Sequence, residues 1–376
     1  MKPLRVLYVS PHAHLGGAER VTMDLLEQHD RTVVEPSVCF LHDGPLVSRC
    51  RDRLGIPTYT VPAPSLRNLV QRRRAVRTIA DLVTAGGVDL VHSAMAWGHL
   101  YGGAAARKAR RPAVWFQHVG ASWGSLIEAT ASFVPARAVI ANSAYTARGQ
   151  RRVNPRRARI EVIHPGTAIP PEPWAARRAR GRAVLGLTDD EFAVGIAARL
   201  QGWKGQDVVI RAAASLCHAR PQARLFVIGD ARFGLEAEYA ASLPRLAVEL
   251  GIHERATFTG FREDVPDCLA ALDVAIHAST SPEPFGLGLI EAMAAGTALV
   301  AADGGAVREI VSPGVDAILT PPGDHEALAA ALLMLCDDPA QRRSLAAEGA
   351  FTARERFDRV DMTFKVQELY QALVPR

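Results

Sequence analysis

Short apolar segments alternate with longer segments that are apolar on one side along most of the chain. Runs rich in β-branched residues predict buried parallel strands, and the amphipathic segments between them predict helices. In the first half, the expected strands are 4–10, 88–93, 113–118 and 138–142, and the expected helices are 18–28, 67–84 and 98–110. Such alternation is typical of a doubly wound α/β domain.

The alternation restarts after a proline-rich segment at 164–180. Proline disfavours a continuing helix, so this segment is predicted to be an extended linker. The strands expected beyond it are 192–198, 224–229, 256–260, 274–278 and 298–302. Because 376 residues exceed what one core usually supports, we expect two domains, at 1–166 and 181–356.

Composition narrows the class of protein. The chain is 48% hydrophobic and 22% charged, as in ordinary globular proteins, and 44 basic against 39 acidic residues favour an anionic partner. Five scattered cysteines form no Cys-x-x-Cys pair, so we expect a reducing cytosol rather than disulfides or zinc. The N-terminus lacks a secretory pattern and no apolar stretch reaches ~20 residues, so membrane contact is expected to be peripheral.

The strongest local motif is SPEPFGLGLIEAMAAG at 281–296, in which Glu283 and Glu291 flank a glycine turn that opens a helix. Amides at Phe285, Gly286 and Leu287 would face a diphosphate at this helix N-terminus. Glu291 can then bond ribose hydroxyls and Glu283 a sugar. Alternatively, both are ordinary carboxylates at the start and on the surface of a helix. Without a third glycine, the motif does not indicate a nicotinamide enzyme.

Arg199 and Lys204 follow the strand at 192–198, at the carboxyl edge of the second sheet. Ligands bind at this edge in open α/β folds, and two cations there can neutralise a leaving diphosphate. No Asp-x-Asp occurs, which favours a metal-independent reaction over a metal-dependent one. The alternative is that both are ordinary surface residues.

The first half offers weaker signals. Gly16 and Gly17 precede a helix and allow close backbone approach, or simply form a turn. His118 ends a strand, where it can transfer a proton, donate a hydrogen bond or serve the structure alone. Ser122 lies in a G-x-S-x-G pattern, which raises an esterase hypothesis. The basic run at 72–74 predicts a helix that lies on anionic lipid or is merely solvated.

Taken together, these motifs resemble the retaining glycosyltransferases of family four, with their E-x7-E motif. The segment at 256–279 is also similar to that family, and the resemblance covers nearly the whole chain. It implies the GT-B fold, in which two Rossmann-like doubly wound α/β domains face each other across a cleft. It also implies that a helix at 357–376 crosses back to the first domain. The HPG at 164–166 departs from the Pro-Asn-Gly of many relatives.

The resemblance implies roles for the candidate residues. Arg199 and Lys204 would hold the diphosphate, Glu291 the ribose, and Glu283 the donor sugar. The backbone of Phe285, Gly286 and Leu287 would help to hold that sugar. The base pocket would be Gly260, Phe261 and Arg262. Gly16, Gly17 and His118 would face the sugar and the acceptor.

The activity implied is retaining transfer of a hexosyl group from a nucleotide diphosphate sugar, expected to be UDP-linked, to a hydroxyl acceptor. That acceptor would be a glycan, a lipid-linked sugar or a small molecule, in the synthesis of cell-envelope polysaccharide or glycolipid. The donor is a substrate, and no cofactor, metal or nucleic acid is expected. The site of action would be cytoplasmic, with the helix around Arg67–Arg77 at the inner face of the membrane. A sugar-nucleotide epimerase and an esterase using Ser122 are the alternatives.

Overall fold

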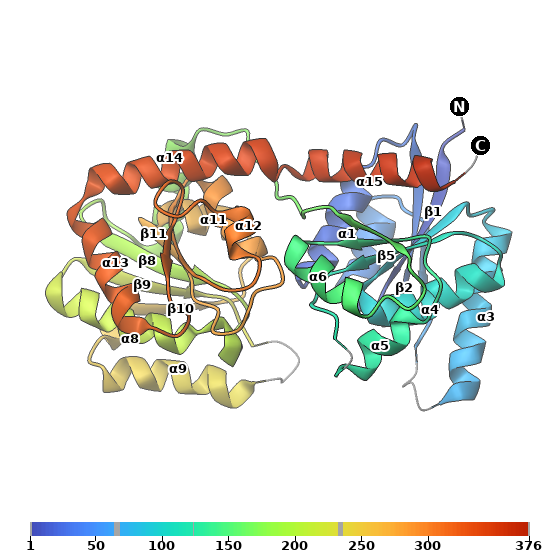
Figure 1. Ribbon diagram of the computed structural model, residues 1–376. Coiled ribbons are helices and arrows are strands. Elements are labelled where there is room, and N and C mark those ends of the chain that lie inside the picture. Colours follow the sequence, from blue (N-terminus) through green and yellow to red (C-terminus); the bar gives the residue numbers. More distant parts are fainter. Residues whose placement is uncertain (1, 64–67, 123, 232–235, 375–376) are drawn as a thin grey trace. The chain divides into compact units, whose positions relative to one another are not determined.

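The chain forms two compact units in a computed structural model that describes residues 2–63, 68–122, 124–231 and 236–374. One unit runs to Gly166 and includes the chain from Arg359 onward, and the other spans Thr167–Asp358. Each unit is a parallel sheet with helices packed on it (Figure 1). The second unit therefore begins within the segment predicted to be a linker.

The N-terminal domain is built on seven parallel strands in the order β3-β2-β1-β4-β5-β6-β7. The strands are β1 (Leu4–Ser10), β2 (Val34–Phe40), β3 (Thr58–Thr60), β4 (Leu90–Ala94), β5 (Ala113–Gln117), β6 (Ala138–Ala141) and β7 (Arg159–Val162). The helices are α1 (Gly17–Gln28), α2 (Pro45–Ser48), η1 (Arg49–Arg53), α3 (Leu69–Ala85), α4 (Met95–Lys108), α5 (Leu126–Ser132), α6 (Ala144–Arg152) and α15 (Arg359–Leu373). The strand order reverses between β1 and β4, as in a Rossmann domain.

The C-terminal domain repeats this plan with six strands in the order β10-β9-β8-β11-β12-β13. The strands are β8 (Phe192–Ala197), β9 (Ala223–Ile228), β10 (Ala256–Gly260), β11 (Val274–His277), β12 (Ala298–Ala302) and β13 (Ile318–Thr320). The helices are α7 (Trp174–Leu185), η2 (Gly202–Lys204), α8 (Gln206–Ala219), α9 (Ala237–Glu249), η3 (His253–Arg255), α10 (Val265–Ala271), α11 (Leu287–Ala295), α12 (Val307–Ile310), α13 (His325–Asp337) and α14 (Pro339–Arg356). Here the order reverses between β8 and β11.

Both faces of the central strands of this second sheet are buried, which is why β8 and β12 are apolar throughout. Val194 and Ile196 of β8 pack in one cluster with α8 and α13. Ala193, on the opposite face of the same strand, packs in another cluster with α10 and α11. The predicted GT-B fold class, with two doubly wound parallel domains, is confirmed.

The extended linker predicted at 164–180 is wrong in its second part, because α7 begins at Trp174. Pro173 stands just before the first turn, where its fixed φ and missing N–H favour a helix start rather than prevent one. The helix then packs closely on α10, since a Cβ at Gly181 would lie 2.0 Å from the carbonyl oxygen of Asp267. Residues 167–180 therefore belong to the C-terminal domain instead of preceding it.

The C-terminal segment changes domain at a short break in its helices. Phe357 and Asp358 separate α14 from α15, and the N–H of Thr167 donates to the carbonyl of Phe357 at 2.8 Å. Beyond the break, Arg359 pairs with Asp24 of α1 at 2.8 Å, and α15 packs on that helix. Within the described part of the chain, no helix combines the length and apolar character needed to cross a membrane.

Candidate active site

A buried ion pair lies where the strand order of the second sheet reverses. Lys204 ends the short helix η2 after β8, and Glu283 follows β11, the neighbouring strand. The ammonium nitrogen of Lys204 lies 2.7 Å from Oε2 of Glu283, and Glu283 is only 6% exposed. Because ligands of doubly wound folds bind beyond the carboxyl ends of the strands at such a reversal, this pair defines the candidate site.

Gly205 sets the position of the lysine. Its φ of +71° is a conformation that favours glycine, and a Cβ there would lie 2.1 Å from the carbonyl oxygen of Ala278. Nearby, the N–H of Thr280 donates to the carbonyl of Trp203 at 2.8 Å. These two backbone contacts hold the segment that bears Lys204 next to the segment that leads to Glu283.

A second glycine supports the glutamate from the other side. The N–H of Ala306 donates to the carbonyl of Glu283 at 2.9 Å, and Gly305 forms an isolated bridge with Glu283. A Cβ on Gly305 would approach that carbonyl oxygen to 2.2 Å. Backbone contacts therefore fix Glu283 independently of its side chain.

Two residues that the sequence did not indicate complete the shell of Glu283. Ser279 donates from Oγ to Oε2 at 2.8 Å, and His277 Nε2 lies 3.1 Å from the same oxygen. His277 ends β11 and so has the same signal in the sequence as His118, a histidine at the carboxyl end of a strand.

Opposing effects act on the ionisation of the pair. Burial alone would raise the pKa of Glu283, but the hydrogen bond from His277 and the charge of Lys204 bring it well below its usual range. Burial lowers the pKa of Lys204, while Glu283 opposes that shift. The carboxyl group is thus ionised at neutral pH.

The start of α11 lies directly after this pair. Gly286 precedes the helix with φ +106°, and the backbone of Leu287 begins it. The side chain of Phe285 is buried and lies against Phe357, with ring centroids 6.0 Å apart, so only its backbone is available to a ligand. Glu291 is half-buried further along the same helix.

The remaining residues predicted to bind the donor are Arg199 and the segment Gly260–Arg262. Arg199 is exposed in the loop before η2, and its charge contributes to the lowered pKa of Lys204. Gly260, Phe261 and Arg262 lie at the end of β10, an edge strand that β9 and β8 separate from β11. Arg262 pairs there with Asp264 at 2.5 Å.

In the N-terminal domain, Gly16 precedes α1 and Gly17 is its first residue, and neither adopts a positive φ. They form the N-terminus of a helix rather than a strained loop. His118 follows β5 and stacks on Phe116 with ring centroids 4.4 Å apart. Burial lowers its pKa to about 3, so the neutral ring fits hydrogen bonding better than proton delivery.

The structure does not favour the esterase hypothesis. Ser122 is exposed in the connection between β5, which ends at Gln117, and α5, which begins at Leu126. A nucleophile elbow needs its serine at a sharp turn directly between strand and helix. The connection around Ser122 is longer than such a turn.

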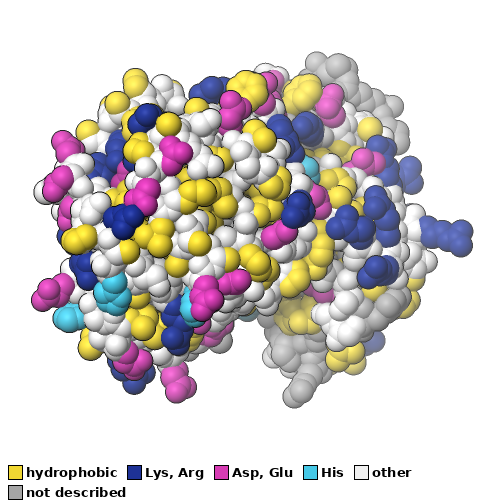
Figure 2. Space-filling view, turned by 60° about the vertical axis from the view of Figure 1, so that its left-hand side comes forward, with side chains coloured by type: hydrophobic (Ala, Val, Ile, Leu, Met, Phe, Trp, Pro, Cys, Tyr) yellow, Lys and Arg dark blue, Asp and Glu magenta, His cyan; other side chains and the backbone are white. Residues whose placement is uncertain are grey.

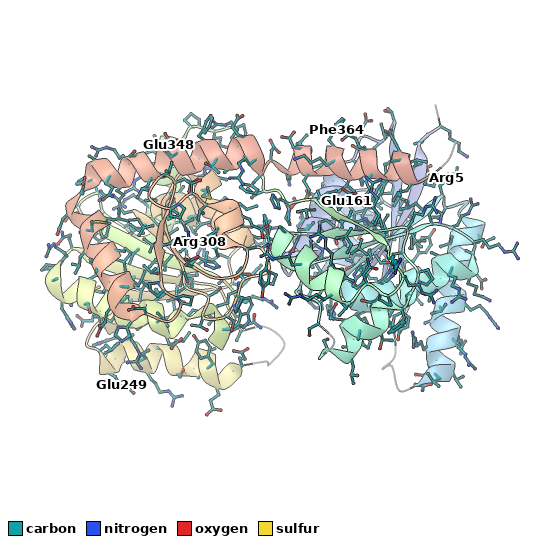
Figure 3. The ribbon with its side chains drawn as sticks, viewed as in Figure 1. Arg5, Glu161, Glu249, Arg308, Glu348 and Phe364 are labelled. Atoms are coloured by element: carbon teal, nitrogen blue, oxygen red, sulfur yellow. The ribbon has the colours of Figure 1, made fainter. Side chains whose placement is uncertain are left out.

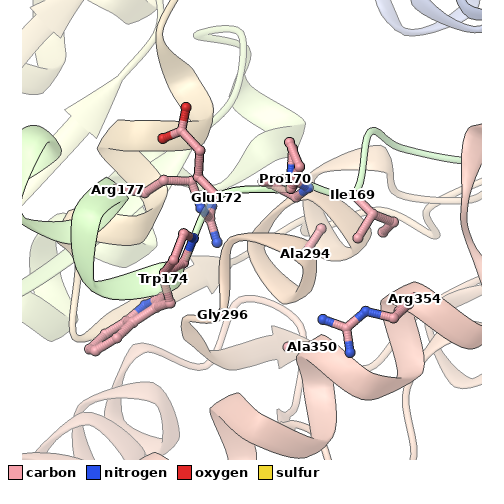
Figure 4. A pocket seen from close by; sticks show the side chains of 11 residues that line it. Ile169, Pro170, Glu172, Trp174, Arg177, Ala294, Gly296, Ala350 and Arg354 are labelled. Atoms are coloured by element: carbon pink, nitrogen blue, oxygen red, sulfur yellow. The ribbon is translucent and has the colours of Figure 1, made fainter.

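A pocket of about 300 Å³ lies at the opposite end of α11 from Gly286 (Figure 4). It is lined mainly by the segment 169–174 with Arg177, by the end of α11, and by Ala350 and Arg354 of α14. Arg177 donates to the carbonyl of Ala295 at 3.2 Å, where a cation satisfies the end of that helix. The pocket is therefore separate from the candidate site. The described residues contain no group of three or more His, Cys, Asp or Glu side chains that could hold a metal.

Two family models together match most of the chain. "Glycosyltransferase Family 4" matches residues 15–169, and "Glycosyl transferases group 1" matches residues 178–350. The first range lies in the N-terminal domain except for its last three residues, and the second lies within the C-terminal domain. The match in the second range includes every donor-side candidate residue.

Similar proteins carry glycosyltransferase names. D-inositol 3-phosphate glycosyltransferases of Mycobacterium ulcerans and Mycolicibacterium smegmatis are 36% and 38% identical over 200 and 168 residues. These alignments cover 52% and 44% of this chain but only 40% and 37% of those relatives, so the chain matches less than half of their length.

Solved structures match over the full length. HepE of Anabaena, in complex with UDP and glucose, is 28% identical, with a TM-score of 0.85 over 98% of this chain and 99% of that one. Sucrose-phosphate synthase of Thermosynechococcus elongatus, at 21% identity and a TM-score of 0.79 over 99% of both chains, shares the fold.

The fold and these neighbours define a glycosyltransferase of the GT-B class. With a family model matched to each domain, the chain belongs to the GT-B glycosyltransferases of the group 1 and family 4 type.

Proposed function

We propose that the protein transfers a hexosyl group, with retention of configuration, from a nucleoside diphosphate sugar to a hydroxyl acceptor. The observation that carries this proposal is the buried Lys204–Glu283 pair next to the start of α11. It sets a cation, an ionised carboxylate and the first turn of a helix at one edge of the sheet. A sugar diphosphate has the matching chemistry, with anionic phosphates and hydroxyl donors.

Each group has a distinct part in the proposed reaction. Lys204 and Arg199 stabilise the charge that develops on the diphosphate as it leaves, and Glu283 accepts hydrogen bonds from the sugar. Preorganised cations act strongly in such a site because they need no rearrangement during the reaction. In retaining transfer, the acceptor hydroxyl attacks the face from which the diphosphate departs, while the sugar has oxocarbenium character.

The remaining candidates extend the proposal. Glu291 would bond the ribose, Gly260–Arg262 would line the base pocket, and Gly16–Gly17 with His118 would face the sugar and acceptor. A uridine base is favoured because HepE, a structural neighbour that matches over the full length, was solved with UDP. The proposed reaction needs no metal, so chelation by EDTA should leave turnover unchanged.

Thermal-shift measurements against a panel of nucleotide sugars test the donor. A ligand at a hundred times its dissociation constant stabilises the native protein by ~2.7 kcal/mol, and UDP-sugars should give the largest shift. Incubation with the donor alone then separates transfer from epimerisation, because an epimerase would convert the sugar without an acceptor. NMR of the transferred product reports the anomeric configuration, and inversion would contradict the retaining mechanism.

For the acceptor, we propose a lipid-linked or envelope glycan, with the protein at the cytoplasmic face of a membrane. The start of α3 supports this, because Leu69 and Val70 are 58% and 78% exposed on the same helix as the exposed residues Arg73, Arg74 and Arg77. Apolar and basic side chains together suit an anionic lipid surface. Arg67, which begins the predicted basic segment, lies outside the described residues.

Vesicle flotation tests this surface. Replacing Arg73, Arg74 and Arg77 by Glu should abolish flotation with vesicles of phosphatidylglycerol and phosphatidylcholine. The same exchange at Arg107, Lys108 and Arg111, also exposed on the N-terminal domain, is the charge-matched control. Equal loss of flotation in both variants would mean that the net charge of the protein, and not this helix, drives the binding. If the unmodified protein does not float, a small soluble acceptor such as D-inositol 3-phosphate is favoured.

A further inference from the structure

Three hydrogen-bond donors converge on one oxygen of Glu283. Lys204 Nζ, Ser279 Oγ and His277 Nε2 lie 2.7, 2.8 and 3.1 Å from Oε2. None of these contacts ends on Oε1. The proposed function accounts for the lysine, which also faces the diphosphate, but gives no part to the serine or the histidine.

We propose that His277 and Ser279 are positioning residues, which hold Oε2 of Glu283 so that Oε1 is presented to a hydroxyl of the donor sugar. This inference rests on the proposed function, because it assigns the sugar to Glu283. A carboxylate bonded through one oxygen to three donors on two separate segments cannot rotate without breaking those bonds. Its second oxygen therefore keeps a fixed direction.

The hydrogen-bonding capacity of His277 fits this part. Because an ionised carboxylate only accepts hydrogen bonds, Nε2 of the histidine must carry the hydrogen. Nδ1 is buried and has no hydrogen-bond partner in the described part of the chain, so the ring is committed to Glu283 and Ser279. Only 10% of the side chain is exposed, and it stands at the end of β11 rather than in a loop.

The ionisation of Glu283 also depends on the hydrogen bond from the histidine. A buried carboxyl group tends to take up a proton, and a protonated Glu283 would lose an acceptor site for the sugar. The groups that face it are Lys204, whose ammonium is itself partly desolvated, and the His277–Ser279 pair, while Arg199 acts on Lys204. Removing His277 should therefore make Glu283 easier to protonate.

Calorimetric titration with UDP and with UDP-glucose separates positioning from folding. In His277→Leu, UDP should bind within about twofold of the unmodified protein, whereas UDP-glucose should bind about tenfold more weakly, as expected for one lost hydrogen bond to a charged group. His277→Gln, which keeps a donor at a similar reach, should recover most of the loss. His218→Leu, an exposed histidine of α8, is the matched control.

A second readout is the pH dependence of UDP-glucose binding. The acid limb should move to higher pH in His277→Leu and stay in place in His218→Leu. Ser279→Ala gives an independent variant if His277→Leu does not fold. Equal weakening of UDP and UDP-glucose, or no change in either, would overturn the inference. Failure of the unmodified protein to bind UDP or UDP-glucose would instead overturn the proposed donor.

Discussion

Each domain buries a cluster of polar side chains, but only one of the clusters is charged. In the N-terminal domain, the hydroxyl of Tyr8 lies 2.5 Å from Nε2 of His29 and 2.8 Å from the hydroxyl of Tyr370. Tyr370, on α15, reaches Nδ1 of His92 at 2.6 Å. Burial raises the pKa of both tyrosines and lowers the pKa of both histidines, so all four groups are neutral at pH 7.

This difference in charge indicates a different role for each cluster. A neutral network of hydrogen bonds fixes a helix on a sheet, here α15 on β1 and β4, at little electrostatic cost. The Lys204–Glu283 pair is costlier to bury, and burial of ions is weak evidence for a stabilising role. Such a pair is better explained by a ligand that uses its charges.

Replacing Lys204 should give the largest effect on activity. Lys204→Met should reduce turnover by about 10² to 10³, or ~3 to 4 kcal/mol of barrier, because the leaving diphosphate loses a preorganised cation. It should also destabilise the domain by leaving Glu283 unpaired. Arg308→Met, whose exposed ion pair with Asp303 lies in the same domain, is the control (Figure 3).

A double variant sharpens this test. Lys204→Met combined with Glu283→Gln removes both charges, so stability measured by urea unfolding should recover while turnover should not. Recovery of turnover together with stability would mean that the pair serves folding alone.

Lowering the pH should affect the two clusters differently. Burial lowers the pKa of His29 to about 3, so below its ordinary value of 6.5 the unfolded state binds more protons and the folded state loses stability. The pKa of His92 is lowered in the same direction. Between pH 6.5 and 5.5 the two histidines should together cost the N-terminal domain about 2 kcal/mol of unfolding free energy.

The Glu283 cluster should respond only in more acidic solution. Its carboxyl pKa is depressed, so its stabilising contribution is present above the ordinary value of 4.5 and declines as pH falls below it. Hydrogen exchange followed by mass spectrometry at pH 7, 5.5 and 4.5 reports each domain separately. If lowering the pH reduces protection from hydrogen exchange around β11 before it does so around β1 and β4, the expected order of the two clusters is wrong.

Removing one hydroxyl should have the smallest effect. Tyr370→Phe removes one of the two hydrogen bonds of the Tyr8 hydroxyl, which keeps its bond to His29, and leaves Nδ1 of His92 without this partner. The change should cost about 1 to 2 kcal/mol of unfolding free energy. UDP binding should be unchanged. Tyr59→Phe, on an exposed position of β3, is the control, and a loss as small as that of the control would mean that α15 docks without this network.

The sequence predicted the central strands well because their environment leaves a simple pattern. The predicted bounds of β1 and β12, and those of the edge strand β10, match the structure at both ends. Four others, β2, β3, β7 and β13, went unrecognised. The residues VEPSVCF of β2 and RIEV of β7 mix polar and apolar side chains, and β3, β7 and β13 are short strands at sheet edges, so no continuous apolar run marks them.

The charged residues of the candidate site were predictable from the sequence, but the residues that hold them in place were less so. Lys204 and Glu283 lie in recognisable motifs at strand ends, and the structure brings them into contact. The two supporting glycines act through contacts between residues distant in the chain, which residue order does not reveal. Ser279 lies only four residues before Glu283, but the segment between them has no regular period that would mark the contact. The surface in Figure 2 likewise mixes basic and acidic side chains, although the net charge of +5 suggested only an excess of one sign.

Gly205 has a consequence for anyone who wishes to redesign the enzyme. Because its backbone touches that of Ala278, the segment bearing Lys204 has a fixed length and cannot be lengthened or shortened without shifting the cation along the sheet. Libraries aimed at new donors should therefore leave 199–205 intact. They should vary the segment after β10 instead, where Phe261 is 49% exposed.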